Sequence, residues 1–486
     1  MLVVIDSLKP EQLDRAVADG RAPALAKLIE RGVYVRDCVS SFPSVTPVAS
    51  ASITTGLGPD GHRIPSMNWY HAGEGRYVEY GSSFSATRAF GVVRSLFDTV
   101  YNMNMAHLTR EAKTVFEHLD DAGLRTACTT FLIYRGRTRH ELAPDGVYSR
   151  LAKAAQFRHA VYGPTELFYA DLFASRRTDC RSTLGMPGQR DQHTGCVGAH
   201  LVENDLCDFL LLSLPDNDTY SHRHGPYAQV TSIAAADRAI ERVMHAAGGV
   251  DAFLDEYAVI VLSDHSQTAV EERLNVGAAL ADWRVLAPND PQPDEAEIAV
   301  SPAARSAMVY VLDRDRRNEA LPRIRSDLEQ AAGIDLMIWR EGKEAAVWSA
   351  RGELRFAPGG ELVDPRGGRW SVEGELDTLL LWVQDGLLDS RAYPDALARL
   401  WSALECRRAG DLLLSAKPGF EFVDWGGADH VGGGSHGSLH AGDSLGALIF
   451  CGTGPSAADA RAQWSLRDVC PAVLDHFGVE PEQAAA

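Results

Sequence analysis

The sequence lacks any long apolar run. None of its 486 residues lies in a stretch approaching the ~18 consecutive apolar residues that a membrane-spanning helix requires. The first residues, MLVVID, have neither the basic segment nor the long apolar segment of a secretory signal. We therefore expect a protein without a membrane span that is located in the cytoplasm.

The sequence also lacks paired cysteines at metal-binding spacing. It has eight cysteines and no C-x-x-C motif, which argues against a structural zinc knuckle and against a disulfide framework. We expect the eight to be reduced and mostly buried. They are Cys38, Cys128, Cys180, Cys196, Cys207, Cys406, Cys451 and Cys470.

An excess of positive charge is missing as well. The chain has 47 basic and 66 acidic residues, a formal net charge of −19. Bulk electrostatics of this sign disfavour nucleic-acid polymers and anionic membranes as partners. If the substrate is an anion, the site must supply its own local positive charge.

What is present is an alternation of short apolar runs with helical patterns. Apolar runs bounded by turn residues are typical of strands buried on both faces of a parallel sheet, and the segments between them have helical spacing. The sequence therefore predicts an α/β, doubly wound, mostly parallel sheet. The predicted strands are 2–5, 209–212, 259–262 and 447–450, and the predicted helices are 23–31, 111–122 and 229–246.

The segment 281–430 departs from this alternation. It is acidic and proline-rich at 288–297 and glycine-rich at 352–374. We interpret it as an inserted α+β segment, partly core and partly cap, with strands at 309–312, 336–339 and 346–348 and a helix over 318–332. Residues 1–280 and 431–486 then form the catalytic core, which fits the two to four units that the length suggests.

Two residues near the N-terminus have positions suited to a site. Asp6 ends the first apolar run, and ligands of open α/β sheets bind at the carboxyl ends of strands. Thr46 precedes Pro47 in a segment that reads as a helix stopped by Gly56, with Thr46 as N-cap. A hydroxyl there could bind phosphate or act as a nucleophile, although a turn aspartate and a simple capping threonine give the same pattern.

Three later segments each bring an imidazole next to further polar groups. Asp218 and His222 are four residues apart in what reads as the loop after strand 209–212, and Asp264 and His265 follow strand 259–262. His436 follows three glycines that would let the chain pass close to a metal. Oxygen and imidazole ligands of this kind are typical of catalytic zinc sites. Core packing does not readily explain so many such groups at strand ends.

The ordered set of motifs resembles the alkaline phosphatase superfamily, and within it the type I phosphodiesterase/nucleotide pyrophosphatase family. The motifs are Asp6, T-P-x8-G with G-P-x-x-H, D-x-x-x-H-x-H-G-P, S-D-H and S-H-G. The resemblance implies an alkaline-phosphatase-type sheet and two divalent metal ions, with Thr46 beside both as nucleophile and auxiliary metal ligand. It implies one ion held by Asp218, His222 and His436 and another by Asp6, Asp264 and His265; Asp216 does not match the spacing.

The sequence departs from the family pattern where substrate would be held. The family places a phosphate-holding asparagine about 21 residues after the nucleophile, where this chain has Met67. A one-residue shift would make Asn68 the donor, with Trp69 and Tyr70 as an aromatic wall, although a loop asparagine and core aromatics are the alternatives. We expect Asn68, Trp69 and Tyr70 to bind substrate.

The residues and the resemblance together predict a metal-dependent hydrolase of small phosphorylated substrates. Two divalent ions and three carboxylates leave a local charge near +1, which would attract an anion despite the net −19. Three imidazoles favour zinc, with manganese as the alternative. We expect cleavage of phosphodiesters or nucleotide pyrophosphates through a phospho-threonine. Monoesterase, phosphonate hydrolase and phosphotransferase activities remain open, as does the oligomeric state.

Two other classes fit less well. Sulfatases of the same superfamily need a C/S-x-P-x-R motif, which does not begin at Cys38, Ser44 or Thr46. A catalytically silent binding protein would be expected to lack a ligand or the nucleophile, and all seven positions are filled.

Overall fold

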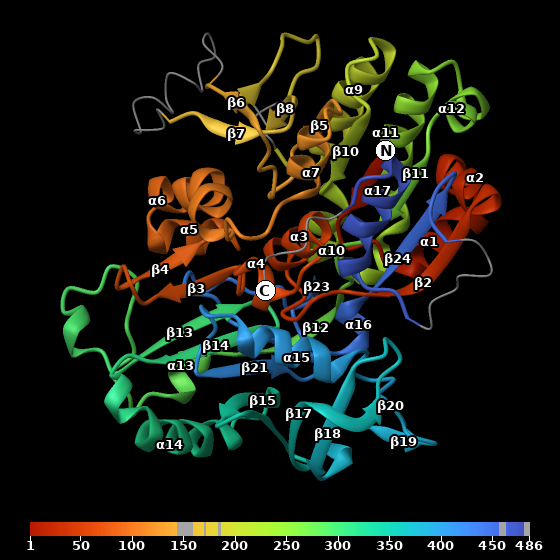
Figure 1. Cartoon of the computed structure of the whole chain (residues 1–486). Helices are drawn as coiled ribbons and strands as arrows, with labels where there is room; N and C mark the ends of the chain where they lie inside the picture. The colour runs from red at the N-terminus through yellow and green to blue at the C-terminus, as the bar shows by residue number, and fades with distance from the viewer. Residues whose placement is uncertain (143–158, 170–171, 183–185, 456–462, 481–486) are drawn as a thin grey trace.

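The main sheet of the protein has eight strands and carries the predicted strands at its centre (Figure 1). The computed structural model describes residues 1–142, 159–169, 172–182, 186–455 and 463–480. The strand order is β2-β24-β11-β1-β10-β5-β8-β9, and β11, β1, β10, β5 and β8 run parallel. The sheet is thus mostly parallel, as predicted, with antiparallel strands at both edges.

The predicted strands agree closely with the observed ones. β1 spans Leu2–Ile5, β10 Phe209–Leu214, β11 Val259–Leu262 and β24 Leu445–Cys451, and almost every residue in them is buried. The remaining strands of this sheet are β2 (Val33–Val39), β5 (Thr126–Thr129), β8 (Glu166–Tyr169) and β9 (Phe173–Ala174). Burial on both faces explains why the central strands are continuous apolar runs.

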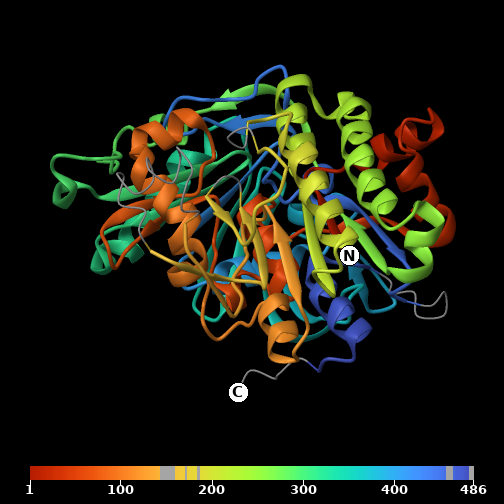
Figure 2. The ribbon, with the colours of Figure 1, turned by 90° about the horizontal axis from the view of Figure 1, so that it is seen from above.

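Helices cover both faces of this sheet. Alternate residues of β1 point to opposite sides, so that Val3 and Ile5 lie in one apolar core and Leu2 and Val4 in another. The first core is covered by α1 (Pro10–Ala18), α2 (Pro23–Arg31), α9 (Arg190–Glu203), α11 (Val230–Ala246) and α12 (Val250–Glu256). The second is covered by α3 (Thr46–Thr55), α7 (Val115–Asp121) and α17 (Val469–Phe477). The view from above shows α9 beside α11 (Figure 2).

A second large sheet lies within the segment predicted to be inserted. Its order is β13-β14-β21-β15-β16-β17-β20-β19, and β18 pairs with β17. The bounds are β13 (Ile298–Ala303), β14 (Ser306–Val311), β15 (Ile334–Glu341), β16 (Glu344–Ser349), β17 (Gly352–Val363), β18 (Arg369–Gly374), β19 (Trp382–Gln384), β20 (Leu387–Asp389) and β21 (Leu412–Ala416). Helices α14 (Arg317–Glu329) and α15 (Ala396–Glu405) accompany this sheet. The glycine-rich stretch 352–374 forms strands as well, which its composition did not indicate.

Arg305 joins the second sheet to the chain that carries His436. It lies at the turn between β13 and β14, its side chain is fully buried, and it forms an ion pair with Asp443 at 2.5 Å. Its guanidinium also donates to the carbonyls of Lys417 and Phe420 at 2.9 Å. The backbone N–H of Arg305 donates to the carbonyl of His436 at 2.8 Å. The position of the second sheet therefore helps to fix the His436 loop.

The expectation that all cysteines are reduced is wrong for two of them. Cys180 and Cys196 form a disulfide, which ties the segment before α9 to the first turns of that helix. The pair is separated by 16 residues and matches no motif, so only the tertiary contact reveals it. The other six are free, and all but Cys207 are buried, as predicted. None of the described helices is long and apolar enough to cross a membrane.

Candidate active site

The candidate residues meet at the carboxyl ends of three adjacent strands of the main sheet. Asp6 directly follows β1, Asp264 follows the neighbouring β11, and Asp218 lies shortly after β10 on the other side of β1. Parallel strands end at one edge of the sheet, so residues distant in sequence converge there. The fold therefore brings these strand-end residues together, as their positions in the sequence led us to expect.

Asp218 and His222 lie on a helix, not in the loop that the sequence suggested. Helix α10 (Asp216–His224) begins two residues after β10 ends. The i, i+4 spacing places both side chains on one face, with His222 Nε2 3.4 Å from Asp218 Oδ1. His436 Nε2 lies 3.8 Å from the same oxygen. The ligand atoms of these three residues lie within 4.8 Å of one another and could hold a cation.

The second set, Asp6, Asp264 and His265, also lies within 4.8 Å. His265 Nε2 is 3.3 Å from Asp264 Oδ2 and 3.7 Å from Asp6 Oδ1. Both of these carboxylate oxygens are buried without any hydrogen-bond partner among the described residues. Burial, together with Asp264 and Asp218, raises the pKa of Asp6 well above its usual range, and burial raises that of Asp264 to about 6. Such crowded carboxylates need a positive charge between them.

Backbone carbonyls orient the imidazoles of the first set. His222 Nδ1 lies 2.8 Å from the carbonyl of Gly434, and His436 Nδ1 lies 2.8 Å from the carbonyl of Ser44. When Nδ1 donates to a carbonyl, Nε2 keeps its lone pair for a metal. Burial lowers the pKa of His436 to about 3, which keeps the ring neutral. These rings are therefore held as metal ligands usually are.

The glycines before His436 allow this close packing. A Cβ on Gly433 would lie 2.0 Å from the carbonyl oxygen of His222, and a Cβ on Gly434 would lie 2.6 Å from Gln267 Oε1. The tripeptide 432–434 can therefore pass directly against α10. The close approach requires the absence of side chains at positions 433 and 434.

Thr46 lies between the imidazole of His265 and the cavity, and it is not a capping residue. Helix α3 begins at Thr46 with Val45 as N-cap, so the predicted start is one residue too late. The left-handed Gly56 ends the helix as predicted. Thr46 Oγ1 lies 3.2 Å from His265 Nε2, the one hydrogen-bond contact of this hydroxyl among the described residues. Since the hydroxyl caps no backbone N–H, the simple capping alternative does not explain it.

The donor set fits divalent metal ions. Three imidazole nitrogens and three carboxylates, two of whose oxygens have no donor among the described residues, converge on two neighbouring positions. The carbonyl contacts of the outer ring nitrogens match the usual support of metal-binding histidines. The residues present therefore fit divalent metal ions beside Thr46.

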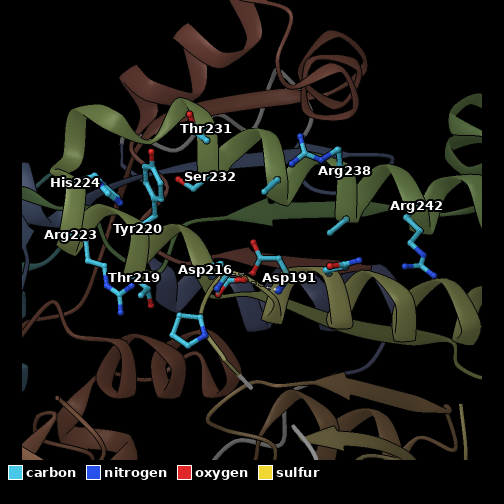
Figure 3. A pocket seen from close by; sticks show the side chains of 15 residues that line it. Asp191, Asp216, Thr219, Tyr220, Arg223, His224, Thr231, Ser232, Arg238 and Arg242 are labelled. Carbon is cyan, nitrogen blue, oxygen red and sulfur yellow. Dashed lines mark hydrogen bonds between the residues drawn. The ribbon is translucent and has the colours of Figure 1, made fainter. Parts of the chain in front are cut away.

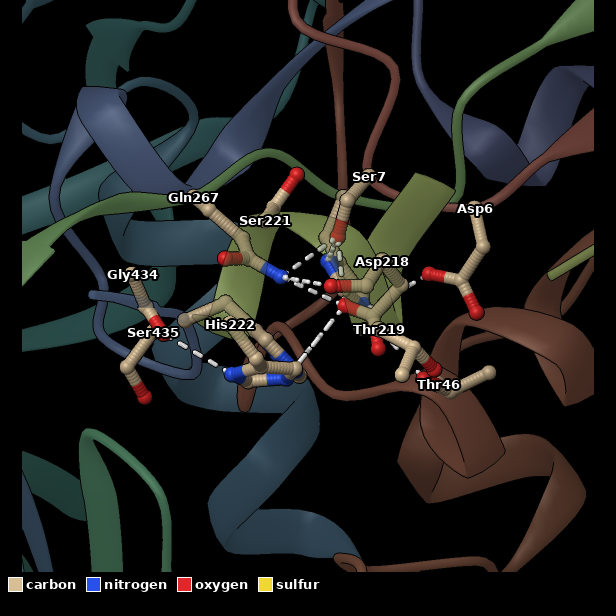
Figure 4. Close-up of polar contacts among 12 residues, drawn as sticks. Asp6, Ser7, Thr46, Asp218, Thr219, Ser221, His222, Gln267, Gly434 and Ser435 are labelled. Atoms are coloured by element: carbon tan, nitrogen blue, oxygen red, sulfur yellow. Dashed lines mark hydrogen bonds and ion pairs between the residues drawn. The ribbon is translucent and has the colours of Figure 1, made fainter. Parts of the chain in front are cut away.

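Two residues that the sequence did not single out connect the two ligand sets (Figure 4). The Ser7 hydroxyl donates to Asp218 Oδ1 at 2.8 Å, and its backbone N–H donates to Asp264 Oδ1 at 3.1 Å. Gln267 Nε2 donates to Asp218 Oδ1 at 2.5 Å and to Ser7 Oγ at 3.2 Å. Ser7 directly follows Asp6, and Gln267 lies two residues after His265. These positions in the sequence could have identified both as candidate site residues.

The site opens into a cavity of about 610 Å³. Its lining includes Thr46, Met67, Arg190, Arg223 and the exposed Phe84. Arg190 is engaged by Asp216 at 2.8 Å, which leaves Asp216 outside both ligand sets, as predicted. Arg223 has no ion-pair partner among the described residues and is exposed. The cavity thus has cationic and aromatic walls beside the two ligand sets.

The structure does not place Asn68, Trp69 and Tyr70 in the lining of this cavity. They belong to β3 (Asn68–His71), which packs against β13, and the Asn68 amide donates to the carbonyl of Pro302. Trp69 is buried, and its ring nitrogen donates to the Tyr80 hydroxyl at 3.2 Å. Met67 lines the cavity instead, and because neighbouring strand residues point to opposite sides, a one-residue shift turns Asn68 away.

A family model described as type I phosphodiesterase/nucleotide pyrophosphatase matches residues 1–439. No protein with curated function matches the chain in sequence.

Solved structures resemble it in fold. Murine ectonucleotide pyrophosphatase/phosphodiesterase 5 is 11% identical with a TM-score of 0.59, covering 100% of this chain and 96% of its own. Phosphonoacetate hydrolase from Sinorhizobium meliloti 1021, in complex with phosphonoformate, is 19% identical with a TM-score of 0.54, covering 97% and 94%.

Proposed function

The chain belongs to the type I phosphodiesterase/nucleotide pyrophosphatase family, and from that premise we propose that it is a two-metal phosphodiesterase with Thr46 as its nucleophile. Membership makes it a hydrolase of phosphate ester or pyrophosphate bonds on the alkaline phosphatase scaffold. The finer assignment rests on one observation. Thr46 Oγ1, with no capping role, lies 3.2 Å from His265 Nε2 at the junction of two three-residue ligand sets.

Zinc is the ion that the donor set favours, and manganese is the alternative. Bound at Asp218, His222 and His436 and at Asp6, Asp264 and His265, the ions would supply positive charge and lower the pKa of a coordinated hydroxyl. Together with the three carboxylates they would leave a charge near +1, which suits an anionic substrate.

The chain's own residues then divide the reaction into two displacements. The deprotonated Thr46 oxygen attacks phosphorus, the bond from phosphorus to the leaving oxygen breaks, and the alcohol or nucleotide departs with a proton. The phosphoryl group is left as an ester of Thr46. Water then attacks the same phosphorus, the bond to Thr46 breaks, and the hydroxyl is restored. Ser7 and Gln267 hold Asp218 and Asp264 in place through both steps.

A diester or nucleotide pyrophosphate is the substrate class we propose, with the cavity walls holding its second substituent. The exposed Phe84 and the side chain of Met67 offer apolar contact there, in place of Trp69 and Tyr70. Phosphomonoesterase or phosphonate hydrolase activity is the alternative, and one observation favours it. Arg223, which has no ion-pair partner in the described part of the chain, lines the cavity and could offset the extra charge of a monoester or phosphonate dianion.

An activity panel separates these functions. The purified chain is stripped with chelator, reconstituted with zinc or manganese, and assayed with bis(p-nitrophenyl) phosphate, thymidine 5′-(p-nitrophenyl phosphate), p-nitrophenyl phosphate and phosphonoacetate. We expect no turnover without metal and higher kcat/KM for the two diesters. A preference for p-nitrophenyl phosphate or phosphonoacetate would replace the phosphodiesterase assignment with the alternative.

A further inference from the structure

A second cavity lies beside the candidate active site, along α9, α10 and α11 (Figure 3). Its volume is about 620 Å³, similar to that of the first cavity. Pro187, Thr219 and Arg223 line both cavities. The two spaces therefore adjoin one another along the edge of α10 that carries Thr219 and Arg223.

Helix α10 borders both cavities and presents mostly different residues to each. Asp218 and His222 face the metal-ligand sets, whereas Asp216, Tyr220 and His224 line the second cavity. Successive residues of a helix turn by 100°, so positions two apart lie on nearly opposite faces. A group bound in the second cavity would contact the helix that supplies two of the six predicted metal ligands.

The second cavity gathers cations that have no acidic partner. Arg238 and Arg242 project from one stripe of α11, and Arg223 lines the other end of the cavity from α10 (Figure 3). None of the three forms an ion pair among the described residues, and Arg242 contacts the disulfide sulfur of Cys196 at 3.2 Å. In a chain with a net charge of −19, three unpaired arginines on one cavity are suited to an anion.

The acidic residues of this cavity do not oppose an anion. Asp216 accepts hydrogen bonds from Arg190 Nε and from the backbone of Gly188, both at 2.8 Å, so its charge is compensated. Asp191 is 3% exposed, and its Oδ2 has no partner among the described residues. Burial and the neighbouring Asp216 raise the pKa of Asp191 to about 8. A protonated Asp191 carries no charge that would repel an anion.

We propose that this cavity is an anion-binding extension of the active site, which holds a second phosphate or carboxylate of the substrate while its scissile phosphorus lies at Thr46. This proposal rests on the proposed function, because the second group is defined relative to the bond that is cleaved. The lining stripe of α11 from Thr231 to Arg242 is ~16 Å long, so it accommodates an extended substrate. Arg223, at the border, contacts both spaces.

A binding measurement tests the cavity without requiring catalysis. Metal-free protein is titrated calorimetrically with inorganic pyrophosphate, since without metal the candidate active site lacks the cations that would attract an anion. We expect the affinity for pyrophosphate to fall at least tenfold in Arg238→Ala/Arg242→Ala. In Asp191→Asn it should stay within about threefold of the wild-type value, because asparagine is neutral like the protonated aspartate. The matched control Arg21→Ala/Arg407→Ala removes two exposed arginines outside both cavities and should bind normally. The proposal is overturned if the wild-type protein does not bind pyrophosphate, or if Arg238→Ala/Arg242→Ala binds it as tightly as the wild type.

An activity measurement then tests whether the bound anion belongs to the substrate. The reconstituted enzyme is compared on thymidine 5′-(p-nitrophenyl phosphate) and on the same ester carrying a 3′-phosphate. We expect the extra phosphate to raise kcat/KM, and Arg238→Ala/Arg242→Ala to remove that advantage while changing the simple ester by less than about twofold. If the protein binds pyrophosphate but does not prefer the ester with the 3′-phosphate, the cavity is a separate anion site and not an extension of the active site. Failure of all ester hydrolysis would instead contradict the proposed function.

Discussion

At the scale of single residues, Thr46 should carry the reaction without being needed to hold metal. Thr46→Ala removes the attacking oxygen but none of the six carboxylate and imidazole ligands, so we expect kcat to fall by at least about 10³-fold with metal content nearly intact. Thr46→Ser should retain partial activity, because the oxygen survives while the β-branch that restricts its rotamer is lost. Metal analysis and steady-state kinetics check both. Activity of the alanine variant within about tenfold of wild type would contradict nucleophilic catalysis.

Asp191 gives a prediction about pH and stability. Its folded pKa, about 8, lies above the value of an unfolded aspartate, so the unfolded state releases this proton first. Its contribution to the free energy of unfolding is therefore present at low pH and lost as pH rises through about 4 to 8. Asp191→Asn should become more stable relative to wild type by about 1 kcal/mol per pH unit in that window. Denaturant unfolding at pH 5 and pH 8 checks this, and a constant difference would contradict it.

The residues that the sequence could identify are those at motif positions after strands. Asp6 directly follows one apolar run, and Asp264 and His265 lie within three residues of the end of another, so strand-end reasoning located them. Ser7 and Gln267 act through contacts between segments about 260 residues apart, which no local pattern reveals. Asn68 shows another limit of sequence-based prediction. The sequence does not tell on which side of β3 its side chain lies, and this side decides whether Asn68 reaches the cavity.

At the scale of elements, the packing of the 432–434 glycines on α10 should control the first ligand set. Gly433→Ala introduces a Cβ that would lie 2.0 Å from the His222 carbonyl, so the loop or the helix must move. We expect metal affinity and kcat/KM to fall by about 10- to 100-fold, the usual cost of disturbing the support of a ligand. Gly277→Ala is the matched control, since its nearest new contact is at 3.4 Å. Equal metal affinity and kcat/KM in the two variants would show that this packing does not control the first ligand set.

Element type was harder to predict near the site than in the core. Strands β1 and β11 were delimited to the residue because buried parallel strands are continuous apolar runs. Helix α10 carries so many polar and ligand residues that its sequence resembles a loop. Its helical form is stabilised by tertiary contacts such as those of Asp216 and His222. Strand β17 was also not predicted, because its glycines are untypical of a strand.

At the scale of the whole molecule, the buried Arg305 should join the second sheet to the main one. Arg305→Met leaves Asp443 as an unpaired buried charge, which costs about 3–5 kcal/mol. We expect reduced metal affinity as well, because the Arg305 N–H contacts the His436 carbonyl. Arg139→Met removes an exposed pair with Glu141 and should change stability little. Thermal unfolding with and without zinc compares them, and equal stability of the two variants would contradict this role.

The architecture could be predicted from the sequence because strand and helix patterns alternate through most of the chain. The arrangement of the second sheet could not, since its strands pair across long separations and local pattern gives no register. The cytoplasmic location and the division at 281–430 stay predictions.

The central claim is a covalent intermediate on Thr46, and stereochemistry at phosphorus tests it most directly. The reconstituted enzyme cleaves a diester that is chiral at phosphorus through sulfur and oxygen isotopes, and the configuration of the product is determined by ³¹P NMR. Each in-line displacement inverts phosphorus, so attack by Thr46 followed by attack of water predicts overall retention. Overall inversion would show a single direct displacement by water and would contradict the account.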